Sequence, residues 1–564
     1  MKNRKTILIA FIALVSNTLC LHAQYTQAGG TGSLNTITGS SSSPDKSTAL
    51  TGLITSGKKN IAITGNVTLG DIKLESDVNI NISPGVIIKL KPGAKTIFDV
   101  ASDSYSRITN VKIDCNSCSN SQGDKNNPAK RFTMDVSAVA PSQTATAVKL
   151  GNIYNFRLAH FIVNDNYTKI NAITLIPVLD VPAGIPNNDQ PKYLRNITIK
   201  GAPKKGEIQY GHLNKGHIGY GLIQVQSAGH VGFSNLSTVG GVALRLETGS
   251  GIADVKYNRF PFTSDNGNIA KPNNIFGGIH EVVGTNISCL NGWSAVTFSP
   301  HLTKNGKVTI NGASATGSCS TIRIISGFKD SAINGLANFP NADFKYGTFG
   351  PVIIKGNITA ESDNKAQLEK RDYDYYPGSF KGTKTFEQKF PLATFGPNFP
   401  VEGGGEDSAR INCPSLANVL YTAKKSASTS VNNNEGEYEI TFQSPTYTNT
   451  NFVGCISNIL YANDKKAGCR ASSTAKFDNS NKEIEITKTE TVNNSKYSVS
   501  KENNNLSIET IKSAQIHLIN SLGQIVKTTI SNNSSTIDIS NLNNGIYFLR
   551  IQFEDETFSK KIIL

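Results

Sequence analysis

Polar residues that could do chemistry interrupt two apolar stretches of the chain. Gln224, Arg245 and Glu247 lie in HIGYGLIQVQSAGHVGFSNLSTVGGVALRLE at residues 217–247, and His301 lies in AVTFSPHLTKNGKVTI at residues 295–310. A protonated glutamate can donate a proton to a leaving oxygen as a general acid. A guanidinium can bind two oxygens of a sulfate at once. These residues are therefore the candidate site.

Each candidate also has a purely structural interpretation. A single glutamate within a strand most often lies on the solvent face, and an arginine there is most often an ordinary surface cation. His301 follows Pro300 and could make a structural hydrogen bond at a corner of the chain. The residue types alone leave both interpretations open.

The elements that must position these residues are β-strands. Apolar and polar residues alternate in short runs that Gly and Asn separate about every ten residues, as at 222–225, 231–233 and 242–246. Side chains alternate between the two faces of a strand, so Arg245 and Glu247 should share a face.

The same alternation extends over most of the chain. It is regular over residues 61–113, continues at 148–163 and 194–199, and resumes at 279–287, 308–310, 322–325 and 352–358. A chain of 564 residues exceeds what one core usually fills, and runs at a regular spacing without strict identity indicate an irregular solenoid. Residues 44–54 predict a short helix that caps its first coil. Residues 361–422 predict either irregular loops packed on the solenoid or a small subdomain.

The N-terminus has the pattern of an export signal. Three cations precede the apolar run ILIAFIALV, and Leu21-His22-Ala23 ends in a small residue suited to cleavage. The apolar run is too short to span a bilayer and no second run follows, so the sequence predicts a signal peptide at residues 1–23 and no membrane span.

The net charge restricts the partners. Removal of the three signal cations lowers the formal charge from +14 to +11. A basic body favours an acidic partner. The chain lacks an aromatic and basic recognition motif, which argues against nucleic acid. A sulfated or carboxylated polysaccharide fits better.

Seven cysteines remain after removal of the signal peptide, and export to an oxidising compartment favours pairing. Cys289 and Cys319 are thirty residues apart, close to one coil plus a loop, and we expect them to form a disulfide on adjacent coils. Cys115 and Cys118 lack a second pair at zinc-ligand spacing, which leaves a local disulfide or two free thiols.

Three segments carry a family resemblance. GYGLIQ at 219–224, GGVALRLET at 240–248 and SPHLTKNGKV at 299–308 resemble, in the same order, segments of the iota-carrageenases. The resemblance runs more faintly from about Ser47 to about Gly350. It implies an all-β fold, a right-handed parallel β-helix with an N-terminal capping helix, and an inverting glycoside hydrolase.

The resemblance also implies roles for single residues. Glu247 matches the family's acid, Gln224 a residue that helps to hold the water, and His301 a residue essential near the cleavage point. Tyr220, Arg245 and Arg323 are the candidate substrate-binding residues. The family has a carboxylate two residues after the acid, where this chain has Gly249, and Asp330 in GFKD is the candidate substitute.

The C-terminal segment resembles a second family. The run NGIYFLR at 544–550 and the basic, aliphatic terminus KKIIL resemble the sorting domain of the type IX secretion system, which implies a small β-sandwich. The predicted organisation is a catalytic β-helix at residues 24–425, a low-complexity linker at 426–495 and the sorting domain at 496–564.

The resemblances favour an endo-acting hydrolase that cleaves β-1,4 linkages of a sulfated red-algal galactan. Iota-carrageenan is the most favoured substrate. The alternatives are a β-helix lyase acting on a uronate polymer and a non-catalytic polysaccharide-binding β-helix, which Gly249 keeps open. We expect no required cofactor, although a structural calcium or sodium ion could be bound, and a monomer that is secreted or held at the cell surface. The expected partners are the anionic polysaccharide and the type IX secretion machinery.

Overall fold

The computed structural model covers the chain with several gaps. It describes residues 32–101, 106–139, 145–168, 171–180, 198–248, 278–300, 303, 305–327, 347–390, 409–422, 436–450, 459–461, 492–493, 497–502, 505–520, 525–542, 546–553 and 557–563. The chain divides into two compact units, Met1–Arg470 and Ala471–Leu564.

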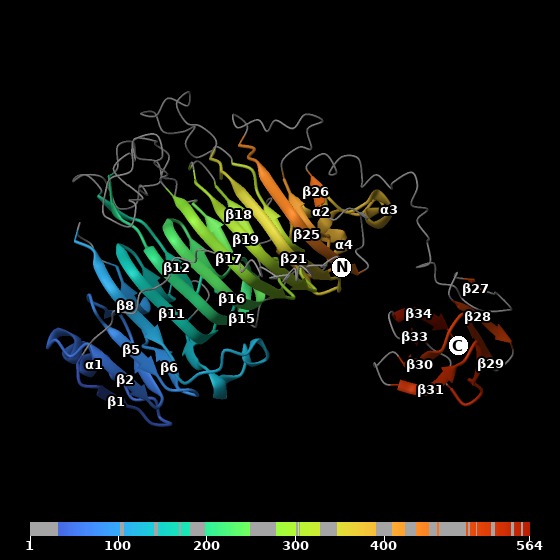
Figure 1. Cartoon of the computed structure of the whole chain (residues 1–564), viewed down its shortest axis with the longest axis horizontal. Coiled ribbons are helices and arrows are strands. Elements are labelled where there is room, and N and C mark those ends of the chain that lie inside the picture. Colours follow the sequence, from blue (N-terminus) through green and yellow to red (C-terminus); the bar gives the residue numbers. More distant parts are fainter. Residues whose placement is uncertain are drawn as a thin grey trace, which may run out of the picture. The chain divides into compact units, whose positions relative to one another are not determined.

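The first unit is a parallel β-helix, as predicted. Its 22 strands pair in parallel, each strand with the equivalent strand one coil further along the chain (Figure 1). The strands of the first coils are β1 (Asn35–Thr38), β2 (Asn60–Thr64), β3 (Val67–Leu69), β4 (Ile72–Lys73), β5 (Asn79–Ile82), β6 (Ile87–Leu90), β7 (Thr96–Val100), β8 (Ile108–Asp114) and β9 (Phe132–Asp135).

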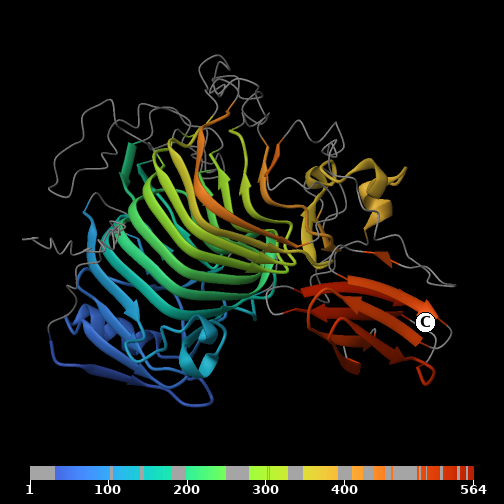
Figure 2. The same cartoon turned by 45° about the vertical axis from the view of Figure 1, so that its right-hand side comes forward.

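The remaining strands, several of them much longer, form the middle and last coils, which curve as a stack in Figure 2. They are β10 (Thr146–Leu150), β11 (Ile153–Asn164), β12 (Ile173–Leu175), β15 (Lys204–Val225), β16 (Ala228–Glu247), β17 (Ile279–Leu290), β18 (Ser294–Ser299), β19 (Val308–Thr316), β20 (Ser320–Ile324), β21 (Val352–Glu361), β24 (Ala417–Tyr421), β25 (Ile440–Thr450) and β26 (Ile459–Tyr461). A separate antiparallel pair joins β13 (Val178–Asp180) and β14 (Thr198–Gly201).

Apolar side chains stack in register through the interior. One such row runs through Ile61, Ile80, Ile113, Leu158, Ile208, Phe233, Gly284, Ile310, Ile354 and Phe442. The coil without insertions measures 25 residues from Ile208 to Phe233 and 26 from Gly284 to Ile310. At Gly284 an added Cβ would lie 2.8 Å from the terminal methyl of Ile310 and 3.3 Å from that of Leu244, so a larger residue would require these side chains to shift.

Helix α1 (Ser47–Thr55) covers the first coil. Its Leu50 and Ile54 are buried in the same core as the first strands. Asp45 accepts a hydrogen bond from the Ser47 amide at 2.9 Å, which satisfies one free N–H of the first turn. The helix confirms the predicted cap.

A small module covers the outer face of the last coils. It comprises β22 (Ala366–Glu369), the short helices α2 (Lys370–Tyr373), α3 (Gly378–Lys381) and α4 (Phe386–Lys389), and β23 (Ala409–Cys413), which pairs with β22. An apolar cluster of its own joins the module to Val242, Trp293 and Leu420 of the coils. The described part of residues 361–422 therefore forms a small module packed on the coils, followed by β24, which is itself a strand of the β-helix.

Two predictions need correction. The parallel ladder continues through β25 and β26, so the β-helix extends past the boundary predicted at residue 425. The polar composition of this last coil imitates a linker, because no further coil covers its outer end in the part of the chain that the structure describes. The predicted disulfide is also wrong, since Cys289 and Cys319 are buried free thiols. Cys289 stacks on Ala315, and Cys319 lies four residues further, just before Ser320, which stacks on Ser294.

Cys115 and Cys118 form a disulfide, which decides between the two states that the sequence allowed. It lies at the start of a segment with two 3-10 turns, η1 (Gln122–Asp124) and η2 (Pro128–Lys130).

The second unit is a small β-sandwich, as predicted. One sheet contains β27 (Val492–Asn493), β28 (Tyr497–Glu502), β29 (Asn505–Thr510) and β32 (Ser534–Asp538). The other contains β31 (Ile525–Ser531), β30 (Ala514–Asn520), β33 (Ile546–Gln552) and β34 (Thr557–Ile563). They enclose a core that includes Leu506, Ile516 and Leu549.

Candidate active site

The candidate residues lie in an outward-facing row across neighbouring coils. Thr174 on β12, Gln224 on β15, Arg245 on β16, Thr297 on β18 and Arg323 on β20 are successive partners in register. The residues on either side of this row, such as Ile223 and Leu244, are buried in the core. The alternation of the strands therefore turns Gln224 and Arg245 away from the interior.

Glu247 joins this row through both oxygens of its carboxyl group. Its Oε2 accepts a hydrogen bond from Nε2 of Gln224 at 2.7 Å, and its Oε1 accepts one from the Arg245 guanidinium at 2.6 Å. Glu247 is only 7% exposed. The structure thus brings together three of the residues that the sequence singled out.

Tyr220 and Arg245 also lie together. The guanidinium carbon of Arg245 is 5.3 Å from the centre of the Tyr220 ring, a cation–π contact. The chain between them bends at Gly240 and Gly241, which have φ of 79° and 62°. An added Cβ at Gly241 would collide with the carbonyl oxygen of Tyr220. The bend separates the half of β16 that pairs with β17 from the half that carries Arg245 and Glu247.

Asn171 supports Gln224 from the preceding coil, and sequence reasoning missed it. Its Nδ2 donates to Oε1 of Gln224 at 2.9 Å, and the residue is 1% exposed. Since that oxygen accepts from Asn171, Nε2 of Gln224 must face Glu247. Asn171 lies 53 residues before Gln224, and its segment NAITL has no feature that marks it as functional.

Arg323 is not placed to bind substrate, which corrects its predicted role. It is 1% exposed, forms an ion pair with the buried Asp372, and its guanidinium carbon lies 4.3 Å from the centre of the Trp293 ring. Nε1 of Trp293 donates to Asp372 at 2.9 Å. The covering module therefore encloses this end of the outward row, and Arg323 anchors it.

A second carboxyl group of the module lies near Tyr220. Glu369 pairs with Arg371, and burial raises the pKa of its carboxyl although Arg371 opposes the shift. A Cβ added at Gly219, the neighbour of Tyr220, would lie 3.6 Å from Glu369 Oε1.

The other catalytic candidates, His301, Asp330 and the position of Gly249, lie outside the described residues. The backbone leading to residue 301 is described: Ser299 pairs with Glu247, and the Thr248 hydroxyl donates to the carbonyl of Pro300 at 2.8 Å. The chain thus passes directly beside Glu247 before it reaches His301.

The described part of the chain contains no group of three His, Cys, Asp or Glu residues that could hold a metal ion. Within the same residues, no helix is both long and apolar enough to cross a membrane.

The chain is similar to known proteins in two of its parts. Residues 500–564 match the model of the secretion system C-terminal sorting domain. The chain is 32% identical over 262 residues to the iota-carrageenase of Zobellia galactanivorans, covering 46% of this chain and 44% of that protein. It is 28% identical over 297 residues to the iota-carrageenase of Alteromonas macleodii, covering 49% and 52%. The chain thus spans about half the length of the curated relatives that it matches.

Solved structures support the fold. A galactohydrolase named for galactose-4-sulfate and 3,6-anhydrogalactose-2-sulfate matches with a TM-score of 0.57 and 21% identity, over 78% of this chain and 93% of that one. An iota-carrageenase complexed to iota-carrageenan fragments matches with a TM-score of 0.54 and 20% identity, over 76% and 93%. Both predicted resemblances, to the iota-carrageenases and to the sorting domain, are confirmed.

Proposed function

We propose that this homologue of iota-carrageenases is an exported, endo-acting glycoside hydrolase that cleaves β-1,4 linkages of a sulfated galactan with inversion, iota-carrageenan first. The observation that carries the proposal is the contact of Gln224, Arg245 and Glu247 on the outer face of the β-helix. It combines a carboxyl group, a water-holding amide and a sulfate-binding guanidinium within one hydrogen-bonded cluster.

In this proposal Glu247 is the general acid. An inverting enzyme needs a second group to activate water on the opposite face of the sugar, with the two carboxyls roughly 6.5 to 9.5 Å apart when that group is a carboxylate. Gln224 holds the water, and Asp330 or His301 activates it. These groups carry out the reaction without a cofactor.

Arg245 couples sulfate binding to the acid. It donates to Oε1 of Glu247, the same carboxyl that must reach the leaving oxygen. A sulfate offers the guanidinium a bidentate partner, and such pairs are among the stronger hydrogen-bonded contacts. We propose that a substrate sulfate draws Arg245 away from Glu247, which favours the protonated carboxyl that a general acid needs. An unsulfated galactan would lack this effect.

The sorting domain supports export by the type IX machinery, followed by release or attachment at the cell surface. We propose that the exported enzyme acts as a monomer on polymer outside the cell.

The test is release of reducing ends by the purified chain from iota-, kappa- and lambda-carrageenan, agarose and alginate. We expect release from iota-carrageenan above all others. Products that absorb in the ultraviolet would instead indicate elimination and a lyase, because elimination leaves a conjugated double bond. Release from none of the five would contradict the proposal and favour a binding protein.

A further inference from the structure

A polar groove lies on a different face of the β-helix from Glu247. It has a volume of about 310 Å³ and is lined by Gln122, Lys125, Asn286, Ser288, Asn311, Gly312, Ala313, Ser314, Asn357 and Thr359. Ser288 pairs, through Ser237, with the first half of β16, whereas Glu247 lies beyond the bend at Gly240 and Gly241. The groove is therefore separate from the candidate active site.

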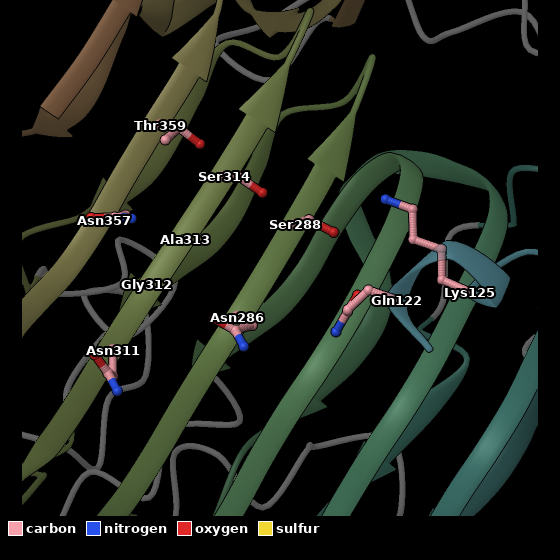
Figure 3. Close-up of a pocket in the computed structure, with 10 residues that line it drawn as sticks. All are labelled: Gln122, Lys125, Asn286, Ser288, Asn311, Gly312, Ala313, Ser314, Asn357 and Thr359. Atoms are coloured by element: carbon pink, nitrogen blue, oxygen red, sulfur yellow. The ribbon is translucent and has the colours of Figure 1, made fainter. Parts of the chain in front are cut away.

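The floor of the groove is a row of hydroxyl groups. Ser288 on β17, Ser314 on β19 and Thr359 on β21 are successive partners in register, and Figure 3 shows them side by side on three neighbouring strands. Adjacent strands lie about 4.8 Å apart, so the row extends over roughly 10 Å. Asn286, Asn311 and Asn357 add amide groups on the same strands. The groove thus offers repeated hydrogen-bonding groups along a line, as a polyhydroxylated chain requires.

Two of these groups are used by the protein itself, since Ser288 donates to the carbonyl of Leu236 and Asn286 donates to Asn235, both at 3.3 Å. Among the described residues, the side chains of Asn311, Ser314, Asn357 and Thr359 make no hydrogen bond. On the neighbouring coils the outward polar groups do pair: His212 bonds to Ser237 at 2.7 Å. The groove therefore keeps free donors and acceptors at Asn311, Ser314, Asn357 and Thr359.

The wall of the groove is held in place. Gln122 begins the turn η1 and Lys125 directly follows it, and this segment projects beside the row in Figure 3. Gln122 donates to Asn235, and the Ser119 hydroxyl donates to Asp124 at 2.6 Å. The disulfide between Cys115 and Cys118 closes the start of this segment. The groove is thus formed before any ligand binds, which lowers the entropy that binding must overcome.

The charged groups at the groove are cations. No carboxylate lines it, and Lys125 contributes an ammonium group that has no ion-pair partner in the described part of the chain. Lys355 is the partner of Asn311 in the next coil and is also without an ion pair among the described residues. Hydroxyl and amide groups, with one cation in the lining and a second beside the lining residue Asn311, match a chain that carries both hydroxyl and sulfate groups.

We propose that this groove is a second, non-catalytic binding site for the sulfated galactan, which holds the polymer while the active site cleaves another part of it. The ligand class rests on the proposed function, whereas the site rests on the groove itself. A second contact with the same polymer raises the effective concentration of chain at the active site.

The experiment measures retardation in native gels that contain iota-carrageenan, with the Glu247→Gln chain as parent so that the polymer stays intact. Lys125→Ala with Lys355→Ala removes both cations, and Ser314→Trp fills the groove. Each should raise the polysaccharide concentration for half-retardation by about tenfold, as expected when charge-assisted hydrogen bonds are lost. Ser314→Ala, which leaves the groove open, should have a small effect.

The matched control is Lys58→Ala with Lys89→Ala, which removes the same charge from exposed positions on the first coils. It should leave retardation close to that of the parent. With Glu247 restored, both groove variants should also cleave a short oligosaccharide as fast as the wild type, because the active site is unchanged.

Groove variants retarded like the parent would overturn the second site while leaving the hydrolase proposal standing. Equal weakening by the control pair would show only a general charge effect, which also overturns it. Absence of both retardation of the parent and hydrolysis by the wild type would overturn the proposed function as well.

Discussion

At the scale of single residues, the carboxyl of Glu247 is the centre of the candidate chemistry. Glu247→Gln keeps the shape of the side chain but removes the proton that a general acid donates. General acid catalysis is typically worth about 10²- to 10⁴-fold, so reducing-end release should fall by at least that factor. The matched control is Glu281→Gln on β17, whose carboxyl pairs with Lys307 at 3.5 Å and should leave turnover unchanged. Turnover of Glu247→Gln near the wild-type rate would remove Glu247 from the mechanism.

A second prediction at this scale concerns Asn171, a positioning residue. Asn171→Ala leaves the Gln224 amide without the donor that orients it, so we expect kcat to fall about tenfold, the effect of one lost hydrogen bond in a buried site, with little change in KM. Asn79→Ala removes a similar amide pair, Asn79 to Asn60 at 2.9 Å, on the first coils and should leave kcat unchanged. A rise in KM alone would show that Asn171 only shapes the binding surface.

At the scale of elements, the turn after β11 contains a carboxyl that favours its neutral form. Burial raises the pKa of Asp165 to about 6, although Thr168 donates two hydrogen bonds to it. The unfolded value is about 3.9, so the stabilisation is fully present below about pH 4 and is lost as the pH rises through 6.

Asp165→Asn imitates the neutral form at every pH. It should therefore raise the free energy of unfolding at pH 7 by up to about 2 kcal/mol and change it little at pH 4. Chemical denaturation at both pH values measures this difference. Asp363→Asn, at a more exposed carboxyl beside Lys365, is the control and should show no such pH dependence. A variant less stable than the wild type at pH 7 would contradict the assignment.

The covering module depends on one buried carboxylate. Asp372 pairs with Arg323 and accepts from Trp293, and all three residues are almost fully buried. Asp372→Ala leaves the Arg323 charge buried without its partner, which typically costs about 3 to 5 kcal/mol. Thermal and denaturant unfolding of the catalytic unit measure the loss. Arg371→Ala removes a less buried cation of the same module and should cost less; an equal cost would mean that burial of Arg323 is not the cause.

At the scale of the whole molecule, we expect hydrolysis to require only the first unit and export to require the second. β27 pairs with β28, so the sorting sandwich includes residue 492 and extends upstream of the boundary predicted at residue 496. A chain ending at Arg470 should fold, cleave the same polysaccharide at the wild-type rate and remain inside the outer membrane of its native host. Fractionation followed by reducing-end assays checks both parts. Failure of the truncated chain to fold in a second host would mean that the sandwich is integral to the catalytic unit.

Local pattern in the sequence was sufficient for the strands, the capping helix and the shared strand face of Arg245 and Glu247. The reason is that side-chain alternation depends only on neighbouring residues. The resemblance to the sorting domain and the three carrageenase-like segments are local in the same sense. These features could be predicted because no distant part of the chain affects them.

The tertiary structure alone decided which residues meet across coils and what covers them. The stacking partner of Cys289 is Ala315 because the coil measures 26 residues, a length that insertions hide in the sequence. Asn171 reaches Gln224 from 53 residues away, and Arg323 is buried by a module that begins more than forty residues after it. The polar groove likewise joins residues 122–125 to three coils between 286 and 359. Such contacts depend on the length of every coil and insertion between the partners, which no local pattern records.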